Sequence, residues 1–171
     1  MDLAQFNALD HEAAVTVLHG LCHCQRWAQD VAQARPFDSL ASLQESCEQC
    51  WQDASEAEIL EAFAGHPRIG DVNALRDKYS TANREQGQVG AASDVVLDEL
   101  LASNRDYEAR HGFIFIVCAS GKSAEEMLAL LKARLPNSRE QELATGAGEQ
   151  AKITALRLQH LFAAGAEEAT A

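Results

Sequence analysis

Apolar residues in this chain recur at intervals of three and four, and runs that alternate apolar with polar residues are nearly absent. One such stripe consists of Ala14, Val17, Leu18 and Leu21. A helix brings residues three and four apart onto one face, whereas a strand brings together every second residue. The sequence therefore predicts an all-α fold, a single compact domain of about seven or eight helices with no significant sheet.

Helix start and stop signals divide the chain further. Serine and aspartate accept hydrogen bonds from the first free amides of a helix, and proline and glycine end one. The predicted helices run from Asp10 through Leu21, from Cys24 to about Ala34, from Ser39, from Ser55 to Ala64, from Ser93 to near Gly112, and from Ser123 and Ser138. Phe113 to Cys118 has strand propensity but no partner strand, so we expect it to be buried and either irregular or helical.

Composition limits the classes of protein to consider. The 171 residues suit one domain, 1–171, with a flexible Ala/Glu-rich tail after about residue 163. A net charge of -12 without a basic patch disfavours nucleic acid. The longest apolar run, Phe113 to Ala119, is too short for a bilayer, and no leader is apparent, so we expect no membrane association and a cytoplasmic protein. Five cysteines are an odd number, which favours reduced thiols.

Arg157 is the first candidate functional residue. It shares a helical face with Ile153, Leu156, His160 and Leu161, which places a permanent cation on an apolar stripe. A buried charge needs a partner, so Arg157 requires a carboxylate, a phosphate or an anionic ligand. An internal ion pair or a snorkelling side chain would satisfy the pattern equally well.

His66 and the polar stretch that follows it are the next candidates. His66 precedes Pro67 where a helix is expected to end, and a histidine there either exchanges protons or only caps and packs. Asp71 to Gly90 is polar and resembles a functional loop region. Within it, Glu85 and Gln86 offer an acceptor beside an amide, although such a pair is often just solvated surface.

The cysteines raise the question of a zinc site. Cys22, His23 and Cys24 with Cys47 and Cys50 could supply four ligands. Both groups lie inside helical patterns, and residues two apart on a helix point to different faces, so we expect no metal. A redox role for Cys47 and Cys50 is also disfavoured, because the strand that usually precedes such a motif is missing.

Several segments form a characteristic series when they are taken in order. They are Phe6 to Leu9, Trp27, Arg35-Pro36-Phe37, His66 to Gly70, Glu85-Gln86, Asn104 and Tyr107, Gly112 to Phe115, and Glu149 to Ile153 with Arg157-Leu158. Together they resemble the OHCU decarboxylase family of uric acid degradation, in which OHCU is 2-oxo-4-hydroxy-4-carboxy-5-ureidoimidazoline. The resemblance covers nearly the whole chain. It implies an all-helical fold, usually a homodimer, that decarboxylates OHCU to (S)-allantoin without a cofactor.

The resemblance also implies a set of site residues. His66 and Glu85 would be catalytic. The substrate would be bound by Pro67, Ala82, Asn83, Arg84, Glu85, Gln86, Arg157 and the backbone of Phe115, Ile116, Val117, Cys118 and Ala119. The family often has serine where this chain has Ala82, and an aromatic residue where it has His111. A different class, an acidic helical module that binds a partner without catalysis, remains the alternative.

Overall fold

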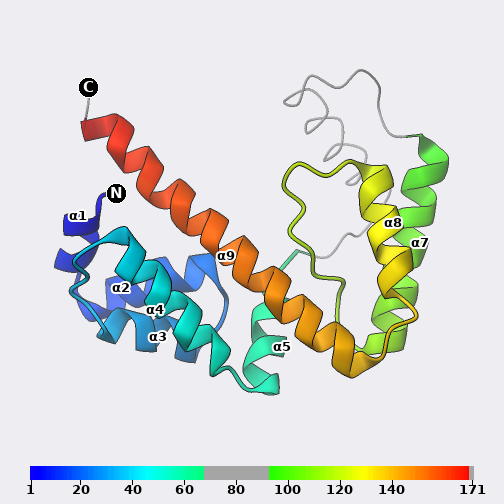
Figure 1. Ribbon diagram of the computed structural model, residues 1–171, viewed down its shortest axis with the longest axis horizontal. Coiled ribbons are helices and arrows are strands. Elements are labelled where there is room, and N and C mark those ends of the chain that lie inside the picture. The colour runs from blue at the N-terminus through cyan, green and yellow to red at the C-terminus, as the bar shows by residue number, and fades with distance from the viewer. Residues whose placement is uncertain (68–92, 170–171) are drawn as a thin grey trace. The chain divides into compact units, whose positions relative to one another are not determined.

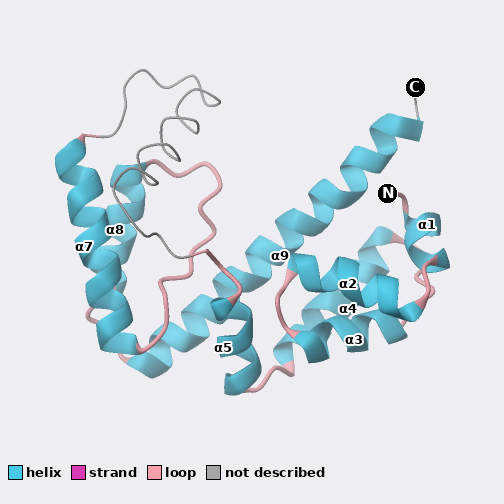
Figure 2. Cartoon of the chain, turned by 180° about the vertical axis from the view of Figure 1, so that it is seen from behind, coloured by secondary structure: helices cyan, strands magenta, loops and turns pink. Residues whose placement is uncertain are grey.

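The computed structural model describes residues 1–67 and 93–169, with side chains placed as far as residue 163 (Figure 1). Over these ranges the chain forms eight α-helices and no strand (Figure 2). They are α1 Leu3–Ala8, α2 His11–Leu21, α3 Gln25–Gln33, α4 Leu40–Gln52, α5 Glu56–Ala64, α7 Asp94–His111, α8 Ala124–Arg134 and α9 Arg139–Ala169. The predicted all-α class with seven or eight helices is confirmed.

The chain divides into two compact units. The first comprises Met1–Gly65 with Ala147–Ala171, and the second comprises His66–Gly146. The residues of α9 are shared between them, because its first turns belong to the second unit and the remainder to the first. The flexible tail expected after about residue 163 stays a prediction, and α9 is helical through Ala169.

The first unit is built around α2, α3 and α4, which surround buried aromatic and aliphatic side chains. Trp27 is 1 % exposed, and its indole donates to the carbonyl of Cys47 over 3.0 Å. The rings of Phe6 and Phe162 meet edge to face with centroids 6.0 Å apart. A buried indole that keeps a hydrogen-bond partner adds apolar area without leaving a polar atom unsatisfied.

Helix α1 was not predicted, because six residues are too few to show a period. Asp2 and Gln5 form its capping box, in which each side chain accepts a hydrogen bond from the other residue's backbone amide. Arg35 then fixes the helix end by donating to the carbonyls of Phe6 at 2.9 Å and Leu9 at 2.7 Å. The segments around Phe6 and Arg35, two of those that resemble the family, thus contact each other and hold the end of α1 in place.

The second unit contains α7 and α8, which lie side by side (Figures 1 and 2). Ser93 caps α7 as predicted, and Gly112 ends it with φ of 80°, a left-handed conformation that glycine adopts without steric cost. Residues 114–119 have no regular structure, which is one of the two predicted alternatives, irregular or helical. The predicted burial holds for Phe113 and Ile116, whereas the other residues of the segment are half-buried. Ser123 begins α8, and Ser138 with Gln141 completes a capping box before α9.

The apolar face predicted for the last helix was wrong. From Gln150 to Phe162 its buried residues follow a four-residue spacing: Gln150, Thr154, Leu158 and Phe162. His160 is exposed, and Arg157 is only half-buried. The polar Gln150 and Thr154 occupy the inward face because each finds a partner there: the Gln150 amide donates to the Thr154 hydroxyl, which donates to the Gln150 carbonyl.

Candidate functional site

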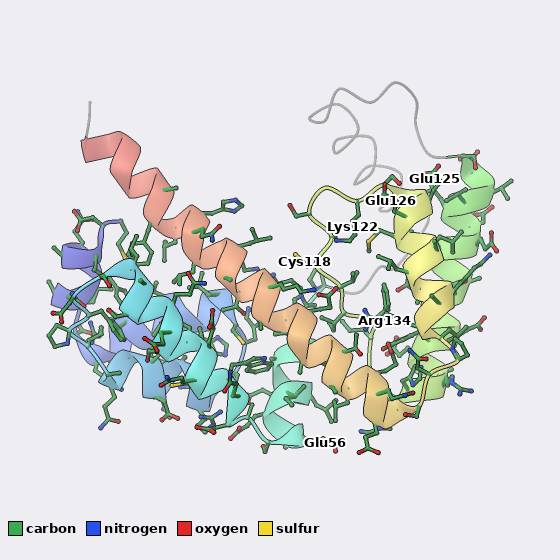
Figure 3. The ribbon with its side chains drawn as sticks, viewed as in Figure 1. Glu56, Cys118, Lys122, Glu125, Glu126 and Arg134 are labelled. Carbon is green, nitrogen blue, oxygen red and sulfur yellow. The ribbon has the colours of Figure 1, made fainter. Side chains whose placement is uncertain are left out.

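An arginine holds the irregular segment that follows α7. Arg134, in the last turn of α8 (Figure 3), donates from Nη1 to the carbonyl of Ile116 over 2.8 Å. Its guanidinium also lies over the Phe115 ring, 4.5 Å from the centroid. An arginine accommodates both contacts because its planar group stacks on a ring while its edge donates. The segment therefore has a fixed position although it lacks secondary structure.

Glu142 compensates the charge of Arg134. One carboxylate oxygen of Glu142 accepts from Arg134 Nε at 2.8 Å and from Tyr107 Oη at 2.7 Å, and the other accepts from Asn137 Nδ2 at 3.1 Å. Glu142 is fully buried and Arg134 is 9 % exposed. Burial alone would raise the pKa of Glu142, but the three hydrogen bonds and the arginine charge hold it below its usual value.

Tyr107 connects this ion pair to the aromatic side chains of the segment. Its ring lies 5.2 Å from that of Phe115, 6.1 Å from that of Phe113 and 4.4 Å from that of His111. Burial and the hydrogen bond to the Glu142 carboxylate raise the pKa of Tyr107. His111 is itself buried, with Nε2 3.1 Å from the Leu135 carbonyl oxygen. Histidine at this position therefore packs as an aromatic residue would.

A second cation, Lys122, bonds the segment at a point nearer along the chain to the start of α8. Lys122 Nζ donates to the carbonyl of Cys118 over 2.8 Å, and both residues are labelled in Figure 3. Both are half-buried. Ile116 and Cys118 are two residues apart, so two cations bond two carbonyls of the stretch from Phe115 to Ala119. The resemblance implies that this stretch binds the substrate. Its backbone is held by Arg134 from α8 and by Lys122 from the loop before α8.

His66 lies where the sequence predicted, directly after the C-cap of α5. Gly65 is that cap, and a Cβ added to it would lie 2.1 to 2.4 Å from atoms of the His23 side chain. Only a glycine therefore fits before His66. His66 is half-buried and Pro67 is exposed. The predicted helix exit is confirmed, whereas the catalytic role of His66 stays a prediction.

Arg157 belongs to the first unit, whereas His66 and the stretch from Phe115 to Ala119 belong to the second. Its Nη1 donates to the carbonyl of Leu21 over 3.0 Å. This bond anchors the guanidinium but does not neutralise its charge. The predicted substrate-binding residues Ala82, Asn83, Arg84, Glu85 and Gln86 lie outside the described residues.

The cysteines are free thiols, and three of them are buried. Burial raises the pKa of Cys22 and of Cys47 to about 12. Both line a small pocket in the first unit, together with Trp27, Gln44, Glu48, Trp51, Ala151, Thr154, Ala155 and Leu158. Among the described residues, no group of three or more histidine, cysteine or acidic side chains is placed to hold a metal ion.

None of the helices in residues 1–67 and 93–169 combines the length and hydropathy required to cross a bilayer.

The family model for OHCU decarboxylase matches residues 7–159. The chain belongs to the OHCU decarboxylase family. Over 168 residues it is 30 % identical to the 2-oxo-4-hydroxy-4-carboxy-5-ureidoimidazoline decarboxylase of Amia calva, covering 95 % of each chain. It is 34 % identical to the uric acid degradation bifunctional protein TTL of Arabidopsis thaliana over 82 % of its own length. It spans 45 % of that protein, and about a third of the bifunctional relatives from two Bacillus strains.

Solved structures agree with this assignment. A crystal structure of OHCU decarboxylase in the presence of (S)-allantoin superposes with a TM-score of 0.73, at 30 % identity over 91 % of this chain and 99 % of that one. An (S)-allantoin synthase structure also gives 0.73, over 94 % of this chain and 53 % of that one. At 18 % identity, this second likeness shows the fold alone.

Sequence reasoning missed Arg134, Glu142 and Lys122. A signal for Arg134 was present, because it continues the buried face of α8 formed by Ala124, Met127, Leu128 and Leu131. The criterion applied to Arg157, a cation on an apolar stripe, selects Arg134 as well. Nothing local identifies Glu142 as its partner, because Tyr107 and Arg134 reach it from two other helices.

Proposed function

We propose that this chain catalyses the decarboxylation of OHCU to (S)-allantoin and CO2 in the degradation of urate. The observation that carries the proposal is the family match over residues 7–159, together with relatives of similar length that are named for this reaction. The fixed backbone from Phe115 to Ala119 supports it, since this stretch corresponds to the substrate-binding backbone that the resemblance implies.

The proposed reaction uses the substrate as its own electron acceptor. The bond between ring carbon C4 and the carboxylate breaks, and its electron pair forms a C4–C5 double bond as the electrons of the C5=N imine move onto nitrogen. Protonation of that ring nitrogen and of C5, with loss of the 4-hydroxyl proton, then gives allantoin with its carbonyl at C4. One proton is taken up for each CO2 released, so no external oxidant or reductant takes part. Decarboxylases that lack such an acceptor recruit a cofactor.

The protein's task is then to bind and orient OHCU. We assign Arg157 and the amides from Phe115 to Ala119 to the anionic substrate, and Glu85 and Gln86 to the ureido and ring nitrogens. Pro67 with Ala82, Asn83 and Arg84 completes the proposed binding residues. Alanine at 82 offers no hydroxyl, so a hydrogen bond there would come from a neighbouring residue such as Asn83.

We assign proton transfer to His66, with Glu85 as the second catalytic residue. A histidine exchanges protons near neutral pH, and a group on one face of the planar intermediate delivers a proton to that face only. Such delivery yields a single enantiomer. The tight approach of Gly65 to His23 supports the assignment, because it restricts the backbone from which His66 projects.

The finer features of the family complete the proposal. We propose a cytoplasmic homodimer, as the resemblance implies. Light scattering coupled to gel filtration should give twice the 18.6 kDa chain mass. A single-chain mass at micromolar concentration would contradict the dimer and leave the reaction untouched.

The test of the reaction is the rate of OHCU disappearance with the protein and with its variants. We expect His66→Ala to reduce kcat roughly 10² to 10⁴-fold, the usual contribution of a general acid or base. Arg157→Ala should act mainly on KM. His160→Ala is a matched control, because His160 is exposed on α9 and should leave both parameters unchanged. Full kcat in His66→Ala would refute the proton-transfer role.

A further inference from the structure

Two cations bond the backbone stretch to which we assign substrate binding. They bond it at carbonyl oxygens, on the side of each peptide unit opposite the N–H. Arg134 donates to the Ile116 carbonyl and Lys122 to the Cys118 carbonyl, each over 2.8 Å. The carbonyl of Ile116 shares a peptide unit with the N–H of Val117, and that of Cys118 with the N–H of Ala119. Each cation therefore acts on one particular amide.

The geometry of a trans peptide fixes where those amides point. Among the described residues only the Arg35-Pro36 bond is cis, so both of these units are trans. In a trans unit the carbonyl and the N–H point in opposite directions. The N–H groups of Val117 and Ala119 therefore point away from Arg134 and Lys122, respectively. Within the described part of the chain, neither N–H donates to another protein group.

The same arrangement makes these amides stronger donors. A cation at a carbonyl oxygen draws electron density along the peptide unit, and hydrogen bonds linked in this way reinforce one another. Val117 and Ala119 are half-buried residues two positions apart, so at most about 7 Å of chain separates their N–H groups. That distance suits two donors to one small anion, as in the oxyanion holes of other enzymes.

We infer that Arg134 and Lys122 are positioning residues that orient and strengthen the Val117 and Ala119 N–H groups as donors to the carboxylate of a ureido-acid substrate. This inference deepens the proposed function and rests on it for the identity of the substrate. It also accounts for the buried charge of Arg134. A buried ion pair adds little stability, and this one fixes a segment that has no secondary structure of its own.

The test is binding of ureidoacetate, a stable ureido carboxylate, compared with uncharged ureidoacetamide. In 15N–1H spectra the amide protons of Val117 and Ala119 should move downfield with ureidoacetate and stay in place with ureidoacetamide. Lys122→Met should weaken ureidoacetate binding roughly three- to tenfold, the usual effect of losing support for one charged hydrogen bond, and should abolish the Ala119 shift. Lys122→Arg, which retains a cationic donor, should restore both.

Lys132→Met is the matched control. It removes the same charge from α8, where Lys132 pairs with Glu99 at the surface. We expect it to leave binding and melting temperature unchanged. For Arg134, whose single loss would strand Glu142, the double variant Arg134→Met/Glu142→Leu removes both charges, and the Val117 shift should disappear in a folded protein.

Each outcome separates this inference from the proposed function. Equal ureidoacetate affinity in Lys122→Met and Lys132→Met, or unmoved Val117 and Ala119 amides at saturation, would overturn the inference even if OHCU is decarboxylated. If the wild-type protein does not decarboxylate OHCU but binds ureidoacetate in a Lys122-dependent manner, the assignment of the two N–H donors holds and the proposed reaction is refuted. If ureidoacetate does not bind at all, the inference is overturned directly.

Discussion

Replacing Glu142 with glutamine should destabilise the second unit strongly. Glu142 is fully buried and accepts from Tyr107, Arg134 and Asn137. Glutamine keeps one oxygen, which can accept from Tyr107 and Arg134, and its amide group would face Asn137, whose own amide can turn to accept. The hydrogen bonds are thus largely replaceable, and the negative charge is the main loss.

The size of the effect follows from burial. With Arg134 only 9 % exposed, its charge would be left without a counter-ion in the interior. Breaking a buried pair in this way costs roughly 3 to 5 kcal/mol. We expect the lower end, about 3 kcal/mol, because the glutamine oxygen still accepts hydrogen bonds. For a chain of this length that corresponds to a fall in melting temperature of roughly 6 to 12 °C.

Thermal unfolding followed by circular dichroism measures this shift. The matched variant is Arg134→Met/Glu142→Leu, which removes both charges and should unfold within about 1 to 2 kcal/mol of the wild type, because apolar replacement of a buried pair is often neutral. A melting temperature for Glu142→Gln within about 2 °C of the wild type would refute the reasoning, since it would mean that Arg134 needs no counter-ion.

Three further predictions concern other parts of the chain. Gly65→Ala should lower the melting temperature by several degrees, because its Cβ would lie 2.4 Å from His23 Cβ; His23→Gly should rescue it and His23→Ala should not. The pKa of Glu142 is lowered in the folded state, so its ionised form stabilises the fold above the unfolded pKa of about 4.3, and this stabilisation is lost as pH falls through the folded value. The free energy of unfolding should therefore depend less on pH, in the acid range, in Arg134→Met/Glu142→Leu than in the wild type. Iodoacetamide at about pH 8 should modify half-buried Cys118 before Cys22 and Cys47, whose burial raises their pKa to about 12, and peptide mass mapping would show the reverse order if this is wrong.

Helix positions could be predicted because their signals are local. Asp10, Ser39, Ser55 and Ser93 each cap the helix expected after them, with the side chain accepting from the amide three residues on. The left-handed Gly112 ends α7 where the sequence indicated. Helix α1 was not predicted because its six residues are too few to show a period, and its end is held by Arg35, about thirty residues away.

The site was less predictable because its bonds join distant residues. The position of His66 followed from a local helix end. The pairing of Arg134 with Glu142 and with the Ile116 carbonyl joins three segments, and no local pattern encodes it. On α9 the spacing of apolar residues predicted the wrong buried face. Gln150 and Thr154 lie on the buried face because they hydrogen-bond to each other there, and Arg157 is only half-buried.

The most direct test of the proposed reaction is the stereochemistry of its product. OHCU is generated freshly from urate with the two enzymes that precede this step, and circular dichroism of allantoin is followed with and without the protein. OHCU also decays spontaneously, so the protein must accelerate the conversion and impose one hand. We predict rapid appearance of the (S)-allantoin signal in proportion to protein concentration. Racemic allantoin formed at the uncatalysed rate would contradict the proposed function.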